Sequence, residues 1–305
     1  MCQIDAMGAQ TQRGVAFSTA STLGTSPSSD LGESDGNGFL SRWADDLDAI
    51  AELGVRAVRF SLDWARLQPR PNELDGEWVE WYGSLLTASL RLGLEPWLTL
   101  YDGSIPKWFD DEGGFGDTVA AGRWWPRWVE RVAEQFGDTA AGWVPLVGRV
   151  DNARPVWRDT WIALRGGRRV VRPFALPDER QLLDGGDQSC DVVGVVLAPM
   201  STGSTMIDDR IAERELERFG ELLRMAAEEG PERPLAIASF ETSLLDADSH
   251  GRVVEQLRLA IDDVVSDGIA VEVGFVGPAV SVGENHLGLV DRDIGPTAAG
   301  TVWFG

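Results

Sequence analysis

Few residues in this chain are suited to covalent crosslinks or to metal binding. Cys2 and Cys190 are its two cysteines, which is typical of a reduced compartment and excludes a scaffold stabilised by disulfides. His250 and His286 are its two histidines, and neither has a partner at the spacing of a zinc site. We therefore expect no metal ion and no cofactor.

Long apolar runs are also missing, since no stretch approaches the roughly 20 residues that cross a bilayer. Residues 1–14 lack the basic segment and apolar core of a secretory signal, so we expect a cytoplasmic protein. The chain is acidic, and its net charge of −22 would repel nucleic acids and anionic membranes, whose binding depends on lysine and arginine. We expect neither as a partner, and no feature of the sequence specifies an oligomeric state.

The chain has the length and the alternation of a parallel α/β barrel. Its 305 residues suffice for one (β/α)8 TIM barrel, and no linker or internal repeat marks a second domain, so residues 1–305 are predicted to form one domain. A first strand begins at Arg13, and apolar periodicity predicts alternating strands and helices after it. The predicted strands are 55–63, 95–101, 142–150, 168–174, 190–197, 235–240 and 271–276, and the predicted helices are 39–53, 76–92, 118–136, 154–164, 208–229 and 251–265.

One segment departs from this alternation. Residues 176–188 are loop-like and show no helical pattern between the fifth and sixth predicted strands. Loops on a barrel tolerate deletion far better than strands do. A compact barrel with shortened peripheral loops and a missing fifth helix is one interpretation.

The stretch Val58–Pro69, VRFSLDWARLQP, is predicted to be a buried strand that ends in reactive groups. Its apolar residues alternate with Arg59, Ser61 and Asp63, and a period of two places each set on its own face of a strand. A guanidinium, a hydroxyl and a carboxylate therefore share one face. Barrel enzymes build their sites at the carboxyl ends of the strands, so this segment indicates where a site would lie.

The same stretch resembles the second-strand motif of glycoside hydrolase family 1, the β-glucosidase family, which is roughly YRFSISWSRLxP. Residues 96–100 and 105–108 resemble the third-strand motif PxxTLxHxDxPxW, and residues 288–291 and 296–304 resemble the closing motifs of that family. The resemblance runs through nearly the whole chain in order. It implies a (β/α)8 barrel and a small carbohydrate-like ligand.

The two catalytic glutamates that the resemblance implies are not at their usual places. A retaining glycosidase needs two carboxylates about 5 to 5.5 Å apart, one as nucleophile and one as acid and base. Alignment with the fourth-strand motif puts Val147 at the usual asparagine and Gly148 at the acid and base, and alignment with the seventh-strand motif puts Ser239 at the nucleophile. Glu241 lies two residues further along, which is about 6.6 Å on a regular strand.

The resemblance implies further losses among the residues that hold the sugar. Ser21, Asp102, Val196 and Pro278 stand where that family has glutamine, histidine, asparagine and tryptophan. Arg59 is kept, and the resemblance implies that it holds the nucleophile carboxylate. Polar groups that remain at the expected mouth of the barrel are therefore the candidate site residues. The catalytic candidates are Glu241 and Asp102, and the candidates for substrate binding are Arg59, Asp63, Tyr101, Arg149, Asp151 and Asn152.

Two hypotheses of function remain open. The first is an enzyme of glycosidase ancestry that acts on a sugar, a glycoside or a related small polar ligand with a changed set of acids. The second is a pseudo-glycosidase that binds a carbohydrate-like ligand or a protein partner without catalysis. An enzyme should bring two of the candidate acids together near Arg59, whereas a pseudoenzyme should fill the mouth with residues such as Val147 and Val196. Glu241 could also serve as an acid at a helix start, and Arg59 could pair with a structural acid.

Overall fold

The computed structural model describes residues 11–23, 37–148, 150–174, 189–197, 209–230, 232–241, 247–281 and 288–305. Within them, eight parallel strands form a closed barrel in which each strand pairs with its neighbours in sequence and β1 pairs with β8. The strands are β1 (Gln12–Phe17), β2 (Ala57–Ser61), β3 (Glu95–Thr99), β4 (Gly142–Trp143), β5 (Arg169–Phe174), β6 (Val192–Leu197), β7 (Leu235–Glu241) and β8 (Val271–Gly277). The predicted (β/α)8 fold is confirmed.

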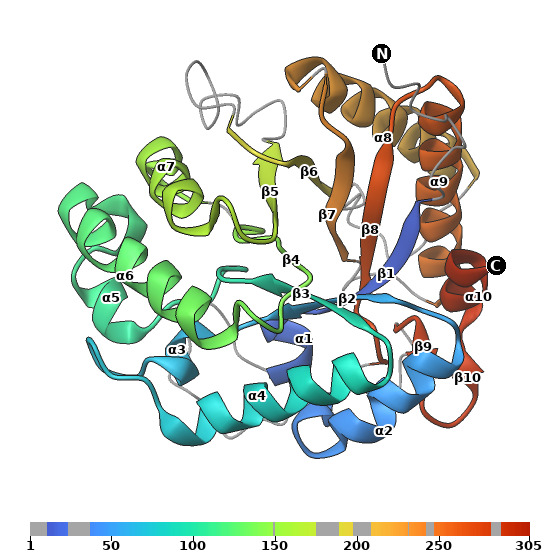
Figure 1. Cartoon of the computed structure of the whole chain (residues 1–305). Helices are drawn as coiled ribbons and strands as arrows, with labels where there is room; N and C mark the ends of the chain where they lie inside the picture. Colours follow the sequence, from blue (N-terminus) through green and yellow to red (C-terminus); the bar gives the residue numbers. More distant parts are fainter. Residues whose placement is uncertain are drawn as a thin grey trace, which may run out of the picture.

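Helices surround the strands (Figure 1). They are α1 (Thr19–Leu23), α2 (Phe39–Glu52), α3 (Trp64–Leu67), α4 (Gly76–Arg91), α5 (Lys107–Asp111), the 3-10 turn η1 (Gly114–Gly116), α6 (Thr118–Phe136), α7 (Ala153–Leu164), α8 (Asp209–Glu229), α9 (Ala247–Ser266) and α10 (Ala298–Phe304). Two short strands, β9 (Val290–Asp291) and β10 (Gly295–Pro296), form a separate pair. The segment in which a fifth helix was in question, 176–188, lies outside the described residues.

Local sequence explains where these helices begin and end. Asp75 and Asp117 accept hydrogen bonds from backbone N–H groups in the first turns of α4 and α6, which satisfies donors that have no partner inside the helix. Gly54 and Gly93 follow α2 and α4 with φ of 77° and 76°, a left-handed conformation that glycine adopts without a steric penalty. Among the described residues, no helix combines the length and the apolar character needed to cross a membrane.

The fourth strand is shorter than the sequence predicts. The prediction extended it over 142–150, whereas β4 contains only Gly142 and Trp143, with an isolated bridge between Tyr101 and Leu146. Pro145 lies between these pairings and has no N–H to donate, so it interrupts the ladder. Its carbonyl still accepts hydrogen bonds from Leu100 and Tyr101, which keeps this segment beside β3.

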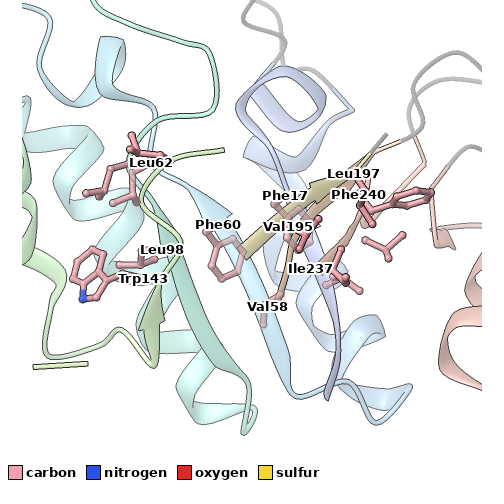
Figure 2. Packing of buried hydrophobic residues seen from close by; sticks show 14 of the residues in the cluster. Phe17, Val58, Phe60, Leu62, Leu98, Trp143, Val195, Leu197, Ile237 and Phe240 are labelled. Atoms are coloured by element: carbon pink, nitrogen blue, oxygen red, sulfur yellow. The ribbon is translucent and has the colours of Figure 1, made fainter. Parts of the chain in front are cut away.

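The alternation in β2 sorts its side chains as the sequence predicts. Val58, Phe60 and Leu62 belong to the outer apolar layer between the strands and the helices, part of which is shown in Figure 2. Ala57 belongs to a second, inner layer, which also holds Trp97 and Phe275. Because residues two apart share a face of a strand, Arg59 and Ser61 follow Ala57 toward the barrel interior.

Candidate functional site

A buried arginine and a glutamate meet at the carboxyl end of the barrel. Arg59 of β2 has no exposed surface, and Glu241 is the last residue of β7. The Arg59 Nη2 donates hydrogen bonds to Glu241 Oε1 at 3.1 Å and to Ser239 Oγ at 3.3 Å. Burial lowers the pKa of the guanidinium, and the neighbouring Glu241 carboxylate partly offsets this. The pair is neutral as a whole, and it presents a carboxylate whose position is fixed by a buried cation at the mouth of the barrel.

The pairing of β7 with both of its neighbouring strands is irregular. Ile237 pairs with Gly274 of β8 and Glu241 pairs with Gly277, so four steps along β7 match three steps along β8. The register with β6 also shifts, after Ile237. An opposite shift on the β8 side, between Leu235 and Ala236, balances this one, so Leu235 and Glu241 pair with Val271 and Gly277. Ser239 and Phe240 pair with consecutive residues of β6, so the irregularity comes before Ser239, and the spacing of about 6.6 Å expected between Ser239 and Glu241 stays a prediction.

The end of β1 joins a second carboxylate to this pair. The Thr19 backbone N–H donates a hydrogen bond of 2.7 Å to Asp102 Oδ2, while the side chain of the preceding residue, Ser18, is hydrogen bonded to Glu241. The Asp102 charge also interacts with both Arg59 and Glu241. Since Cα atoms of adjacent residues are about 3.8 Å apart, two neighbouring residues tie Asp102 and Glu241 into one cluster.

Sequence reasoning missed Ser18 and Thr19. The available signal was their position, because they directly follow the first strand, and barrel enzymes draw their functional groups from that end of the strands. Their partners, Asp102 beyond the end of β3 and Glu241 at the end of β7, lie far away in the sequence. No local pattern therefore indicated which carboxylates they would hold.

The Glu241 carboxylate is both desolvated and reachable. Burial raises its pKa, and the charge of Arg59 is the largest effect in the opposite direction. About a third of the side chain stays exposed, at 30%, whereas Arg59 is enclosed behind it. A carboxylate in this position can attack an electrophilic carbon or accept a hydrogen bond from a ligand hydroxyl.

Asp63, which the sequence suggested for substrate binding, caps a helix. It is buried at the start of α3, and its Oδ1 accepts hydrogen bonds from the N–H groups of Ala65 and Arg66. Its Oδ2 lies 3.5 Å from the Arg66 Nε. Burial raises the pKa of this carboxyl to about 6, although Arg66 acts against the shift. These contacts give Asp63 a structural role as a helix cap. Its contact with a ligand stays a prediction.

This raised pKa gives a stability prediction for Asp63. Between about pH 4 and pH 6 the folded protein holds a proton on Asp63 that the unfolded chain releases, so this residue makes stability fall as pH rises through that window. A shift of this size corresponds to about 3 kcal/mol at neutral pH. Asp63→Asn keeps a good helix cap and should remove the effect. Denaturant unfolding should show the variant to be more stable than the parent at pH 7 and nearly as stable as the parent at pH 4. The same difference in free energy of unfolding at both pH values would contradict this prediction.

The remaining candidates that the structure describes have different surroundings. Tyr101 packs edge-on against Phe115 with ring centres 4.9 Å apart, and burial raises its pKa. Asp151 is exposed, and the exposed Asn152 donates its side-chain N–H to the Phe115 carbonyl at 2.8 Å. Arg149 lies outside the described residues. Ligand contacts by these four residues stay predictions.

The position that the resemblance assigns to the acid and base has no room for a side chain. A Cβ atom on Gly148 would lie 2.8 Å from the Gly103 nitrogen and 2.8 Å from the Tyr101 ring. Carbon atoms do not approach backbone nitrogen that closely, so any larger residue would have to displace the segment 101–103. Val147 and Val196, beside the mouth, pack against the inner apolar layer.

A separate cavity lies at the opposite end of the barrel. It has a volume of about 270 Å³ and is lined by residues at the starts of β1 and β2, together with Phe304 and Gly305. Arg13 and Arg56 on its wall are paired with Asp262 and Glu95. Barrel enzymes build their sites at the other face, where Arg59 and Glu241 meet. We therefore assign no site to this cavity.

Comparison with known proteins agrees with this geometry. The family profile described as Glycosyl hydrolase family 1 matches residues 7–149. Beta-glucosidase A of Thermotoga maritima is 28% identical over 144 residues, which cover 44% of this chain and 32% of that protein. Beta-glucosidase 28 of Arabidopsis thaliana is 37% identical over 113 residues, which cover 35% of this chain and 19% of that protein. The matched stretch is thus about a third or less of the length of these relatives.

The likeness of fold extends further than the likeness of sequence. The solved structure of a family 1 β-glucosidase from Thermotoga maritima superimposes with a TM-score of 0.69 and 15% identity, covering 96% of this chain and 96% of that one. The resemblance inferred from the motif at Val58–Pro69 is confirmed by the family profile and by the relatives. The solved structure extends the likeness in fold to nearly all of the barrel.

Proposed function

Because this chain is a glycosidase-like (β/α)8 barrel of the family 1 type, we propose that it acts on a sugar, a glycoside or a related small polar ligand through a non-standard set of site acids. The observation that supports this most is the Glu241 carboxylate, which is fixed by the buried Arg59 and still partly exposed at the carboxyl end of the barrel. A buried arginine that anchors a reachable carboxylate at this face is the arrangement that the resemblance implies for a nucleophile.

Each charged group has a distinct role in this proposal. Glu241 is the carboxylate that attacks the anomeric carbon, and Arg59 orients it through the 3.1 Å hydrogen bond. Asp102 contacts the ligand as the second carboxylate and accepts hydrogen bonds from sugar hydroxyls. Ser18 and Thr19 hold the two carboxylates in position through their own hydrogen bonds. The names of the relatives make β-glucosides the first substrates to test.

The alternative is a pseudo-glycosidase that binds a carbohydrate-like ligand or a protein partner. Crowding at Gly148 favours it, because the position assigned to the proton donor cannot hold a side chain without displacing its neighbours. Val147 and Val196, which pack against the inner layer, favour it as well. A binding protein would still use Asp102 and Glu241 as hydrogen-bond acceptors for hydroxyls.

An assay against a panel of aryl β-glycosides tests the proposal. We expect measurable turnover of at least one member by the parent protein, and a loss of about tenfold to a hundredfold in kcat/KM for Asp102→Asn, which keeps the size of the side chain and removes its charge. Glu241→Gln, prepared in parallel, measures any contaminating glycosidase.

Equal rates for the parent and both variants, or no turnover by any of them, would refute the enzyme hypothesis. In that case, calorimetric titration of the parent with glucose and cellobiose tests the alternative. Binding that is weakened in Asp102→Asn would support a carbohydrate-binding protein. A protein whose heat signal is unchanged by either sugar would point to a protein partner.

A further inference from the structure

Two serine hydroxyls stand in series beside the Glu241 carboxylate, just after the end of β1. The Ser18 Oγ lies 2.8 Å from the Ser21 Oγ, and the Ser21 backbone N–H also donates a hydrogen bond of 3.3 Å to the Ser18 Oγ. Ser18 is buried and its side chain is hydrogen bonded to Glu241, whereas Ser21, in α1, is half-buried. A row of three hydrogen-bonded side chains therefore leads from α1 to the carboxylate.

A glycine in β8 leaves the space through which Glu241 reaches this row. β8 lies between β7 and β1 in the closed barrel, and Glu241 pairs with Gly277 of β8. A Cβ atom on Gly277 would lie 3.3 Å from the Glu241 Cγ and 3.2 Å from the Ala16 Cβ of β1. Since glycine has no such atom, the Glu241 side chain can lean over β8 toward the end of β1, where Ser18 lies.

The directions of these hydrogen bonds follow from the protons available. A serine hydroxyl has one proton and two lone pairs, and an ionised carboxylate only accepts. Ser18 therefore donates its proton to Glu241, and the Ser21 O–H donates to the Ser18 Oγ. A second acceptor for the Ser21 O–H is the Ser18 carbonyl, but it is further away, at 3.3 Å, and already accepts the Thr22 N–H at 3.0 Å. The row is thus ordered from Ser21 to Ser18 to Glu241.

A hydrogen-bond donor aimed at a carboxylate favours its charged form. Burial raises the pKa of Glu241, the Arg59 charge lowers it, the Asp102 charge raises it and the hydrogen bond from Ser18 lowers it. Hydrogen bonds in series polarise one another, so a donor behind Ser18 strengthens the bond that Ser18 makes. Ser21 therefore acts on Glu241 through Ser18, without a contact of its own.

We propose that Ser21 is a positioning residue for Glu241, which acts through Ser18 to keep the attacking carboxylate ionised and held in place at the mouth of the barrel. The inference rests on the proposed function, because it takes Glu241 as the attacking group. The resemblance placed Ser21 among the residues that hold the sugar, where the family has glutamine. In this structure its hydroxyl is bonded to Ser18.

The pH profile of kcat/KM for 4-nitrophenyl β-glucoside tests this inference in Ser21→Ala and Ser18→Ala. The rise in rate on the acid side reports the ionisation of Glu241, and we expect it to move to higher pH in both variants. At the midpoint of the parent's rise, kcat/KM should fall about threefold in Ser21→Ala and about tenfold in Ser18→Ala, because the second variant removes the donor itself. Well above this midpoint, Ser21→Ala should keep most of the parent's rate.

A measurement without substrate and two control variants complete the experiment. ¹³C NMR of the protein labelled at the glutamate carboxyl carbons follows the titration of Glu241 directly, with Glu241→Gln to assign its resonance. Ser21→Thr keeps the hydroxyl and should return the midpoint to that of the parent. Thr22→Val removes a neighbouring hydroxyl that donates to the Ser18 carbonyl at 2.5 Å rather than to its side chain, and the midpoint should stay where it is.

The outcomes separate this inference from the proposed function. Turnover by the parent, with the same midpoint in Ser21→Ala and Ser18→Ala by both methods, would overturn the inference and leave the enzyme hypothesis intact. A fall in kcat/KM of equal size at every pH in Ser21→Ala would also overturn it, because that is the effect of a merely structural residue. A Glu241 titration that moves in Ser21→Ala, together with no turnover by the parent, would support the row of hydrogen bonds and refute the enzyme hypothesis.

Discussion

Replacing Glu241 with glutamine is expected to lower kcat for an aryl β-glucoside by about a thousandfold or more. The amide has the size of the carboxylate but lacks a nucleophilic oxygen anion, so the covalent step cannot proceed. The effect should be large because Glu241 is the carboxylate that Arg59 fixes, at 3.1 Å, at the open end of the barrel. Steady-state kinetics with the parent and the variant at equal concentration measure it.

A loss of stability would also lower the measured activity, so it has to be distinguished from the loss of the nucleophile. Glu241→Gln leaves the buried Arg59 without its paired charge, and breaking such a pair costs up to about 3 to 5 kcal/mol when both groups are buried. Glu241→Asp is the matched control, because it keeps the charge and shortens the reach by one methylene. We expect the aspartate variant to unfold at nearly the denaturant concentration of the parent and still to lose most of its activity. A Glu241→Gln protein with undiminished kcat would contradict the assigned role.

Removing the indole of Trp64 is expected to destabilise the protein by about 4 kcal/mol, within the range of buried aromatic truncations. Trp64 has no exposed surface, and its ring stacks on Trp128 with centres 5.3 Å apart and packs against Phe109 at 4.8 Å. Its Nε1 also donates a hydrogen bond of 3.0 Å to Gln68. Trp64→Ala would leave a cavity where α3, α5 and α6 come together.

Equilibrium unfolding in urea measures this effect, with Trp78→Ala as the matched control. Trp78 is also a tryptophan on a helix, α4, but it is only partly buried, so its loss should cost clearly less. A loss below about 1 kcal/mol for Trp64→Ala would contradict the central position of this ring in the core. Because Trp64 directly follows the helix cap Asp63, we expect the variant also to flatten the pH dependence assigned to Asp63.

Most of the barrel could be predicted from local sequence patterns, and the error at the fourth strand has a local cause. Helix 118–136 was placed correctly to the residue, because its apolar spacing and its capping aspartate both lie within the segment. The fourth strand was drawn too long, because a proline two residues beyond Trp143 stops a ladder whatever the apolar content around it. The hydrogen bond from Arg59 to Glu241 could not be read from strand periodicity, because it joins two strands that are far apart in the sequence.

The sequence by itself determined the alternation of strands and helices and the face of β2 that carries Arg59, because periodicity and capping depend on residues within a few positions of each other. Only the tertiary structure decided which polar groups meet. Thr19 and Asp102 are 83 positions apart and Arg59 and Glu241 are 182 apart, and closure of the barrel brings them together. It also decided that Asp63 caps a helix, because hydrogen-bond geometry depends on where the chain turns.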